Sequence, residues 1–366
     1  MRYAAACVKT SACVNKYQFG DKMKCSRLCL SILLIVPLFT FAQKYHEPAE
    51  ILKILSDSRL TYDIGMLQSP EIKTVEYPPQ VNHGLFLKKM PNGTRVVTTY
   101  DSEFDSVETY KPNLMTAESA YANKEFSQAR LSYIKALLAA PNSSQVMTFI
   151  GQSFEAEHAF DSAKVWYLRA IDANFYDYMA HWFLADIHWR QQSKDSAITE
   201  ICLARIMNRN NPRLSASFVR IFKDAEINYS DWEFHPAINV EQLPTNHISV
   251  TFDEKHSEWL PYALCKALWK FEPDYRKSML SRVKGLPAVI EETECVMNVI
   301  IGLENSKTST DDKSLKAAKE ALEGNMFSEF IVYDVILPGE PYYAFNLSRE
   351  FMKNVAQYIT KVRTKT

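Results

Sequence analysis

The feature that most constrains this chain is an interval of 34 residues. Three alanines, Ala129, Ala163 and Ala197, follow one another at this spacing. Neighbouring positions recur with them, in the pairs Phe126 and Phe160, Tyr133 and Tyr167, and in the set Ala136, Ala170 and Ala204. A repeat of this length, with small residues where helices meet, is typical of helix pairs that stack and bury one another's apolar faces. The sequence therefore predicts a helical solenoid.

The three copies lie over residues 115–141, 149–175 and 183–209, each read as two helices joined by a polar turn. A small residue recurs on each first helix, as Ala117, Gly151 and Ala185, which allows close approach of the paired helix. Side chains that accept hydrogen bonds from a helix start are predicted to cap the second helices: Ser127, Asp161, Ser162, Asp195 and Ser196. Residues 214–225 form an amphipathic segment that caps the third copy or belongs to the next domain.

This pattern resembles the tetratricopeptide repeat family over about residues 110–211. Pro141 closes the first copy where the family favours proline, whereas Phe175 and Arg209 occupy that position in the others. Lys194 and Ile201 replace aromatic residues in the third copy. The resemblance implies a concave wall of first-helix side chains that binds a protein or peptide, although the family serves very many partners.

The resemblance assigns ten side chains to this wall, eight of them as partner-binding residues. The eight are Glu118, Tyr121, Gln152, Glu155, Trp182, Asp186, Trp189 and Arg190, and Gln145 and Thr148 accompany them. Trp182 and Trp189 are predicted as anchors for a peptide, because tryptophan is frequent among the residues that dominate binding. The alternative is that both tryptophans pack against a neighbouring domain.

Residues 1–42 are predicted to be a secretory signal peptide. A basic start precedes the apolar run LCLSILLIVPLFTF, and a small residue, Ala42, stands at the expected cut. Met23 is an alternative start, and an uncleaved segment would be the chain's one attachment to a membrane. Cleavage removes more basic than acidic residues, so nothing in the mature chain forms the basic stripe that nucleic acids require. We expect an exported protein, periplasmic or secreted.

The flanking regions are predicted to carry a helix and a hairpin before the solenoid, over 43–109, and an α+β domain after it, over 231–366. The hairpin turns at Asn92 and Gly93. In the last region we expect strands at 247–252 and 329–337, and helices at 257–271, 286–305 (stopping near Gly302), 314–325 and after Ser348. The solenoid of about three repeats, with its cap, covers 110–230, so the fold class is α+β overall.

No catalytic, metal or cofactor motif is apparent. Glu291, Glu292, Glu294 and Cys295 crowd one helix start, where acids also suit the helix dipole. His181 and His188 lie seven residues apart, with Asp186 nearby, and show no zinc-binding pattern. Cys202, Cys265 and Cys295 follow the predicted cut, either as free buried thiols or with Cys265 and Cys295 paired.

These observations favour a non-enzymatic, exported adaptor that binds a protein or peptide, with no cofactor and no metal. One alternative is an envelope hydrolase whose site, built from Glu291, Cys295 and a histidine, lies in the C-terminal domain. A second alternative is a structural protein that self-associates through the ends of its solenoid.

Overall fold

The computed structural model describes residues 45–67, 85–104, 106–230, 232–244 and 246–365. The predicted signal peptide with its alternative start at Met23 lies outside the described residues. Contacts divide the chain after Tyr45, and His46–Thr366 forms one compact unit. The fold of this unit is α+β overall, mostly helical with two small sheets.

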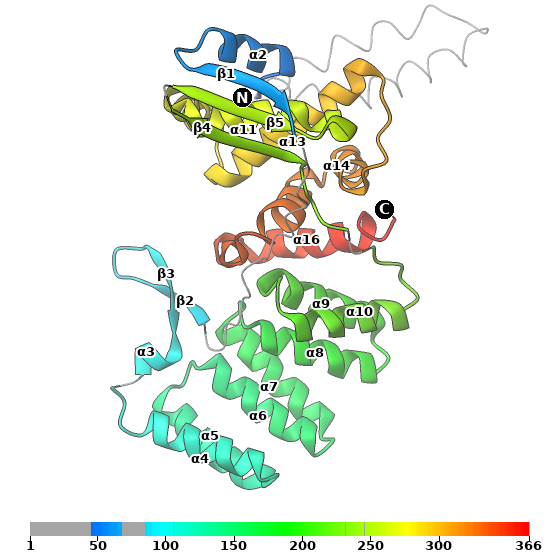
Figure 1. Ribbon diagram of the computed structural model, residues 1–366. Coiled ribbons are helices and arrows are strands. Elements are labelled where there is room, and N and C mark those ends of the chain that lie inside the picture. Colours follow the sequence, from blue (N-terminus) through cyan, green and yellow to red (C-terminus); the bar gives the residue numbers. More distant parts are fainter. Residues whose placement is uncertain (1–44, 68–84, 105, 231, 245, 366) are drawn as a thin grey trace, which may run out of the picture. The chain divides into compact units, whose positions relative to one another are not determined.

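Antiparallel helix pairs stack in chain order through the middle of the unit (Figure 1). Their helices are α4 (Tyr110–Ala122), α5 (Phe126–Ala139), α6 (Ser144–Ala156), α7 (Phe160–Ala173), α8 (Tyr178–Arg190) and α9 (Lys194–Met207), followed by α10 (Pro212–Asp224). The six recurring alanines of the second helices, among them Ala129, Ala163 and Ala197, are fully buried. The predicted small-residue seams are therefore where the helices meet.

Gly151 shows how tight one seam is. A Cβ added at this position would lie 2.4 Å from Cε1 of Tyr167, on the paired helix. Real Cβ atoms do not come so close, so glycine permits this tyrosine to lie flat against α6. The expectation that small first-helix residues allow close approach is confirmed here.

The predicted caps of the second helices are wrong. Helices α5, α7 and α9 begin earlier, and the predicted residues lie inside the first turn, where Asp161 and Asp195 face the positive end of the helix dipole. Side-chain caps recur instead on the first helices, at the same 34-residue interval: Ser143, Asp177 and Asn211. The second helices lack side-chain caps because the turn inside each pair is closed by its backbone conformation.

Each of these turns contains a residue with positive φ. They are Lys124, His158 and Gln192, with φ of 65°, 60° and 60°, and Glu226 after α10 with φ of 61°. The next residue donates its backbone N–H to a first-helix carbonyl, as Ala159 does to Phe154 at 2.9 Å and Ile227 does to Phe222 at 2.9 Å. Helix α10 thus keeps the 34-residue register. It occupies the position of the first helix of a fourth repeat and packs on α9.

The predicted hairpin is formed by β2 (Leu85–Lys89) and β3 (Arg95–Thr99), which pair antiparallel and lead into α3 (Tyr100–Phe104). In its turn only Gly93 has positive φ, at 84°, while the side chain of Asn92 accepts a hydrogen bond from the N–H of Thr94. The hairpin contacts the repeats where Asn174 Nδ2 donates to the carbonyl of Leu85 at 3.0 Å.

The remaining N-terminal elements join the C-terminal region. Helix α2 (Pro48–Ser56) packs on α11 (Leu260–Phe271), and β1 (Thr61–Met66) pairs in parallel with β5 (His247–Phe252). Strand β4 (Ile238–Leu243) completes the sheet in the order β1-β5-β4. The strand predicted at 247–252 is confirmed, whereas β1 and its long-range partner were not predicted.

The C-terminal helices complete this part. They are η2 (Glu254–Trp259), α12 (Pro273–Arg282), α13 (Pro287–Ser306), α14 (Lys313–Glu323), α15 (Phe327–Phe330), η3 (Ile331–Ile336), η4 (Pro341–Asn346) and α16 (Arg349–Lys361). Helix α13 runs past Gly302, where the predicted stop is wrong: a Cβ there would lie 3.2 Å from Pro261, so this glycine serves close packing. The helix ends at Ser306 and is followed by Lys307, its C-cap, whose φ is 54°.

The strand predicted over 329–337 is wrong, because this segment is the helix α15 followed by the π-helical turn η3. Its side chains are buried on every side, including Ile331, Val332, Tyr333 and Asp334. When no face meets water, alternation of residue types no longer distinguishes a strand from a helix.

Candidate partner-binding pocket

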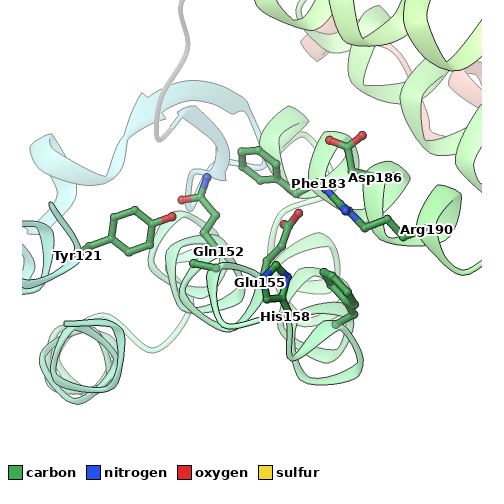
Figure 2. A pocket seen from close by; sticks show the side chains of 9 residues that line it. Tyr121, Gln152, Glu155, His158, Phe183, Asp186 and Arg190 are labelled. Carbon is green, nitrogen blue, oxygen red and sulfur yellow. The ribbon is translucent and has the colours of Figure 1, made fainter. Parts of the chain in front are cut away.

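An open pocket of about 340 Å³ lies on the first helices of the repeats (Figure 2). It is lined by Tyr121, Gln152, Glu155, Ala156, His158, Phe160, Phe183, Asp186 and Arg190. These residues come from α4, α6, α8, the turn after α6 and the start of α7. Three successive repeats therefore contribute to one concavity, as an inner wall of first helices requires.

The wall follows the repeat register. Gln152 and Asp186 stand 34 residues apart and occupy the same position in their helices, and Tyr121 and Glu155 share a second position. Because corresponding residues of stacked helices face the same way, these side chains converge on the pocket. Figure 2 shows Gln152 reaching into the space between Tyr121 and Phe183, and Glu155 lying nearer to Arg190.

Glu155 is held by the paired helix of its own repeat. Its Oε2 accepts a hydrogen bond from the hydroxyl of Tyr167 at 2.7 Å. Burial raises the pKa of Glu155, and the charge of Asp186 adds to the rise, while Tyr167 and Arg190 oppose it. The pocket thus holds the carboxyl group of Glu155 in a fixed position and favours its protonated form more than water does.

Asp186 is the second acid. Its Oδ1 lies 2.6 Å from Nη2 of Arg220, which reaches it from α10. Burial raises the pKa of Asp186, and Arg220 and then Arg190 counter part of that rise. Arg190 packs over the ring of Phe160 at 5.4 Å. Charges of both signs and three aromatic rings therefore line the same concavity.

Five of the eight predicted binding residues line this pocket: Tyr121, Gln152, Glu155, Asp186 and Arg190. Glu118 is exposed outside it, where it accepts a hydrogen bond from Tyr133 at 2.7 Å. Thr148, of the two accompanying residues, is buried and donates to Asp177, and Gln145 does not line the pocket. The pocket thus contains more of the predicted wall residues from the second and third copies than from the first.

The two tryptophans predicted as anchors lie outside the pocket. Trp182 stacks on Phe183 with 5.4 Å between ring centroids. Nζ of Lys194 lies over the ring of Trp189, 5.8 Å from its centroid. Both side chains are half-buried. The aromatic rings that line the pocket are instead those of Tyr121, Phe160 and Phe183.

Sequence reasoning missed four lining residues: Ala156, His158, Phe160 and Phe183. Phe160 stood out only as a recurring packing residue, and its face toward the pocket could not be seen in the repeat pattern. His158 is the positive-φ residue of the turn after α6. The 34-residue register of that turn was the signal that could have placed it beside the pocket.

The hairpin and α3 contact the repeats at other places. Tyr100 hydrogen-bonds Ser144 at the start of α6, and Asn174 binds Leu85 after the end of α7. The pocket residues of α6 and α8 lie in the later halves of those helices. All lining residues belong to the repeats, so none of the described flanking segments fills the pocket.

The residues proposed for a hydrolase do not converge. Glu291 hydrogen-bonds Lys266, and Cys295 is fully buried in a surrounding that raises its pKa, with Cys265 as its neighbour. His46, which comes from the N-terminal side of α2, approaches Glu294 of the same helix, with 3.2 Å between Nδ1 and Oε1. Cys202, Cys265 and Cys295 are all buried free thiols. Burial of this kind keeps a thiol protonated and unreactive.

Neither a metal centre nor a membrane span is found in the described part of the chain. No group of three histidine, cysteine, aspartate or glutamate side chains there is arranged to hold a metal ion. His181, one of the two histidines considered for a metal, lies 2.5 Å from Glu200 and 2.9 Å from the carbonyl of Phe175. Within the same residues no helix has the length and apolarity needed to cross a membrane.

Comparison with solved structures finds tetratricopeptide repeat domains. The Arabidopsis OM64 TPR domain is 14% identical, with a TM-score of 0.31 over 32% of this chain and 97% of that chain. The first TPR of Spaghetti (RPAP3), bound to the HSP90 peptide SRMEEVD, is 13% identical, with a TM-score of 0.31 over 32% of this chain and 94% of that chain.

A third match is the Yersinia enterocolitica type III secretion chaperone SycD, in complex with a peptide of the translocator YopD. It is 16% identical, with a TM-score of 0.30 over 33% of this chain and 98% of that chain. The structural match to this class of repeat domain therefore covers about a third of the chain. No protein-family model matches the sequence, and a search of curated proteins finds no match.

Proposed function

We propose that this protein is an exported, non-enzymatic adaptor that binds a segment of another protein in the pocket of its first helices. The observation that carries the proposal is the pocket itself, to which three successive repeats contribute. The predicted signal peptide motivates export to the periplasm or beyond.

The lining indicates what kind of segment would fit. Tyr121, Phe160 and Phe183 offer apolar surface, and Glu155, Asp186 and Arg190 offer charge of both signs. Aromatic and arginine side chains supply much of the energy in protein interfaces, where charged neighbours fix orientation. The occupant is thus a short stretch of polypeptide with one apolar side chain flanked by polar ones.

Site-specific photocrosslinking tests this proposal in the native cell envelope. A photoreactive amino acid at Ala156, which is exposed inside the pocket, is expected to yield a discrete crosslinked band. The matched control replaces Leu138, which is 76% exposed on α5 outside the pocket. Mass spectrometry then identifies the band.

Three results decide the outcome. A band that forms at Ala156, not at Leu138, and disappears when Phe183→Ala is added supports the adaptor. Equal bands at both positions, or none, remove the pocket from the proposal. A band of twice the protein's mass that contains only this chain favours the self-associating alternative.

A further inference from the structure

His181, on the first helix of the third repeat, is buried and has both ring nitrogens against oxygen atoms. The residue is 1% exposed. Its Nδ1 lies 2.5 Å from Oε2 of Glu200 on α9, and its Nε2 lies 2.9 Å from the carbonyl oxygen of Phe175. The ring of Phe175 meets the imidazole edge-on, with 5.1 Å between centroids. Neither the repeat pattern nor the proposed function uses these contacts.

The two contacts fix how many protons the histidine and its partners hold. A carbonyl oxygen and an ionised carboxylate only accept hydrogen bonds, and a neutral imidazole donates through one nitrogen alone. Both contacts are therefore hydrogen bonds only while the His181–Glu200 pair holds one proton more than a neutral ring and a carboxylate. When that proton leaves, one ring nitrogen faces an oxygen with no hydrogen between them, which is costly in a buried place.

The carbonyl of Phe175 belongs to the α7–α8 loop, residues 174–177, which contacts the regions on both sides of the repeats. The side chain of Asn174 donates to a carbonyl of β2 at 3.0 Å. The hydroxyl of Tyr176 donates to the carbonyl that follows η4 at 2.8 Å. The guanidinium of Arg349, at the start of α16, lies 4.9 Å from the centroid of the Phe175 ring. His181 thus holds a loop through which the repeats contact the hairpin and the C-terminal helices.

The charged and titratable side chains around this pair come from several elements. They are Lys164 of α7, Asp177 at the start of α8, His188 of α8, Arg95 of β3 and Arg349 of α16. Asp177 is engaged as the cap of α8. Burial lowers the pKa of His188, Lys164 adds to the fall and Glu200 opposes it, so Glu200 acts on both histidines of α8. Because the lysine and the two arginines oppose a further positive charge, Glu200 is the group that keeps the extra proton in place.

We propose that the extra proton of the His181–Glu200 pair is a pH-sensitive switch that holds the α7–α8 loop, and with it the contact between the repeats and the C-terminal helices. Histidine changes its charge between about pH 5 and pH 8. Once the extra proton is lost, the remaining N–H stays on Nδ1, because a hydrogen bond to a carboxylate is stronger than one to a carbonyl. Nε2 then faces the Phe175 carbonyl without a proton. The loop is therefore held at low pH and released as the pH rises.

Hydrogen–deuterium exchange of the whole protein, read by mass spectrometry at a series of pH values between about 5 and 8, tests this inference. Each measured rate is divided by the intrinsic rate at the same pH. Peptides that contain residues 174–177 or 345–352 are expected to lose protection as the pH rises, by roughly tenfold, as expected for one unpaired buried polar group. Peptides of α5 are the reference and should keep their protection. Equal protection of residues 174–177 at both ends of the pH range overturns the proposal.

Two variants assign the effect. Glu200→Gln supplies an amide that donates to Nδ1 of a neutral ring, which leaves the ring proton on Nε2 for the Phe175 carbonyl. The loop should then stay protected at every pH. His188→Gln removes the other histidine on which Glu200 acts, and is the matched control in which the pH dependence should persist. A pH dependence that survives in Glu200→Gln, or is absent from His188→Gln, would show that the proton of the His181–Glu200 pair is not the switch.

Discussion

The helical repeats and the C-terminal region hold their cores together by different means. In the repeats, recurring small residues and tyrosines meet across local seams, as Gly151 and Tyr167 do. In the C-terminal region, fully buried charges meet across long stretches of sequence, as Asp334 and Arg363 do at 3.0 Å. Steric fit between neighbours is visible as a period in a sequence, whereas a polar contact between distant elements is not. The contrast can be tested by breaking one contact of each kind.

The largest effect is expected at the buried ion pair. Asp334→Ala leaves Arg363, which is fully buried, without its counter-charge, although Arg363 still donates to the carbonyls of Ser230 and Trp232. Removing one partner of such a pair costs about 3–5 kcal/mol. Urea unfolding followed by circular dichroism measures the loss as a change in the free energy of unfolding.

The control for this change is an ion pair at the surface. Asp311 pairs with Lys316 and is fully exposed, so Asp311→Ala should leave the unfolding midpoint almost unchanged. If Asp334→Ala were as mild as Asp311→Ala, the C-terminal core would not depend on its buried charges, and the contrast with the repeats would fail.

The next largest effect is expected at the seam of the second repeat. Gly151→Ala introduces a Cβ 2.4 Å from Cε1 of Tyr167, and the helices must separate or the ring must turn. Overpacking of this kind costs about 1–3 kcal/mol. The change in unfolding free energy is measured in the same way.

Two further variants sharpen this result. Gly65→Ala is the matched control, because a Cβ there would meet Thr251 at an ordinary 3.6 Å. Repeat three pairs Ala185 with Ile201 at the equivalent positions, so adding Tyr167→Ile to Gly151→Ala copies that seam. The double variant should recover part of the loss, and a purely additive cycle would argue against steric conflict as the cause.

The same contrast explains what could be predicted from the sequence. The period placed the helix pairs and their buried alanines, and five of the eight predicted binding residues came to line one pocket. It could not show that Phe183 lines the pocket and Trp182 does not, because a register gives the face of a helix and not the path of a side chain. The caps were assigned to the wrong helices because positive-φ turns, invisible in residue types, close each pair.

In the C-terminal region the failures have another cause. The segment 329–337 was predicted as a strand because its apolar residues alternate, yet they are buried on all sides of a helix. Strand β1 was missed because its partner β5 lies far along the chain. The residues around a strand do not indicate a parallel pairing with a distant one. Contacts between distant segments determine the structure of the C-terminal region, and a single sequence does not reveal these contacts.

A smaller effect is expected where a tyrosine of a second helix holds an acid of the first. Tyr167→Phe removes the hydrogen bond to Glu155, whose side chain is half-buried, and should cost about 1 kcal/mol. Tyr133→Phe removes the equivalent bond to Glu118, which is exposed and can turn to water, so its cost should be lower. Equal costs in urea unfolding would show that burial of the acid does not govern this contact.

The smallest effect is the pH dependence that Glu155 brings to the repeats. Its pKa is raised above the ordinary value of 4.5, chiefly by burial, so the folded protein retains a proton that the unfolded chain releases. The stability contributed by the protonated acid is complete below pH 4.5 and is lost as pH rises through the folded pKa. The stability of the wild type relative to Glu155→Gln should therefore fall across that window and stay level on either side.

Urea unfolding of both proteins at a series of pH values measures this difference, with Glu118→Gln as the control because Glu118 makes the same kind of bond while exposed. Asp186, whose pKa is raised in the same direction, remains in every variant, so the comparison removes its contribution apart from its repulsion with Glu155. A relative stability that rises with pH would mean that the pocket favours the Glu155 carboxylate. The hydrogen bond from Tyr167 and the charge of Arg190 would then outweigh burial, and the pocket would suit a partner that offers a cation to this acid more than one that offers an apolar side chain.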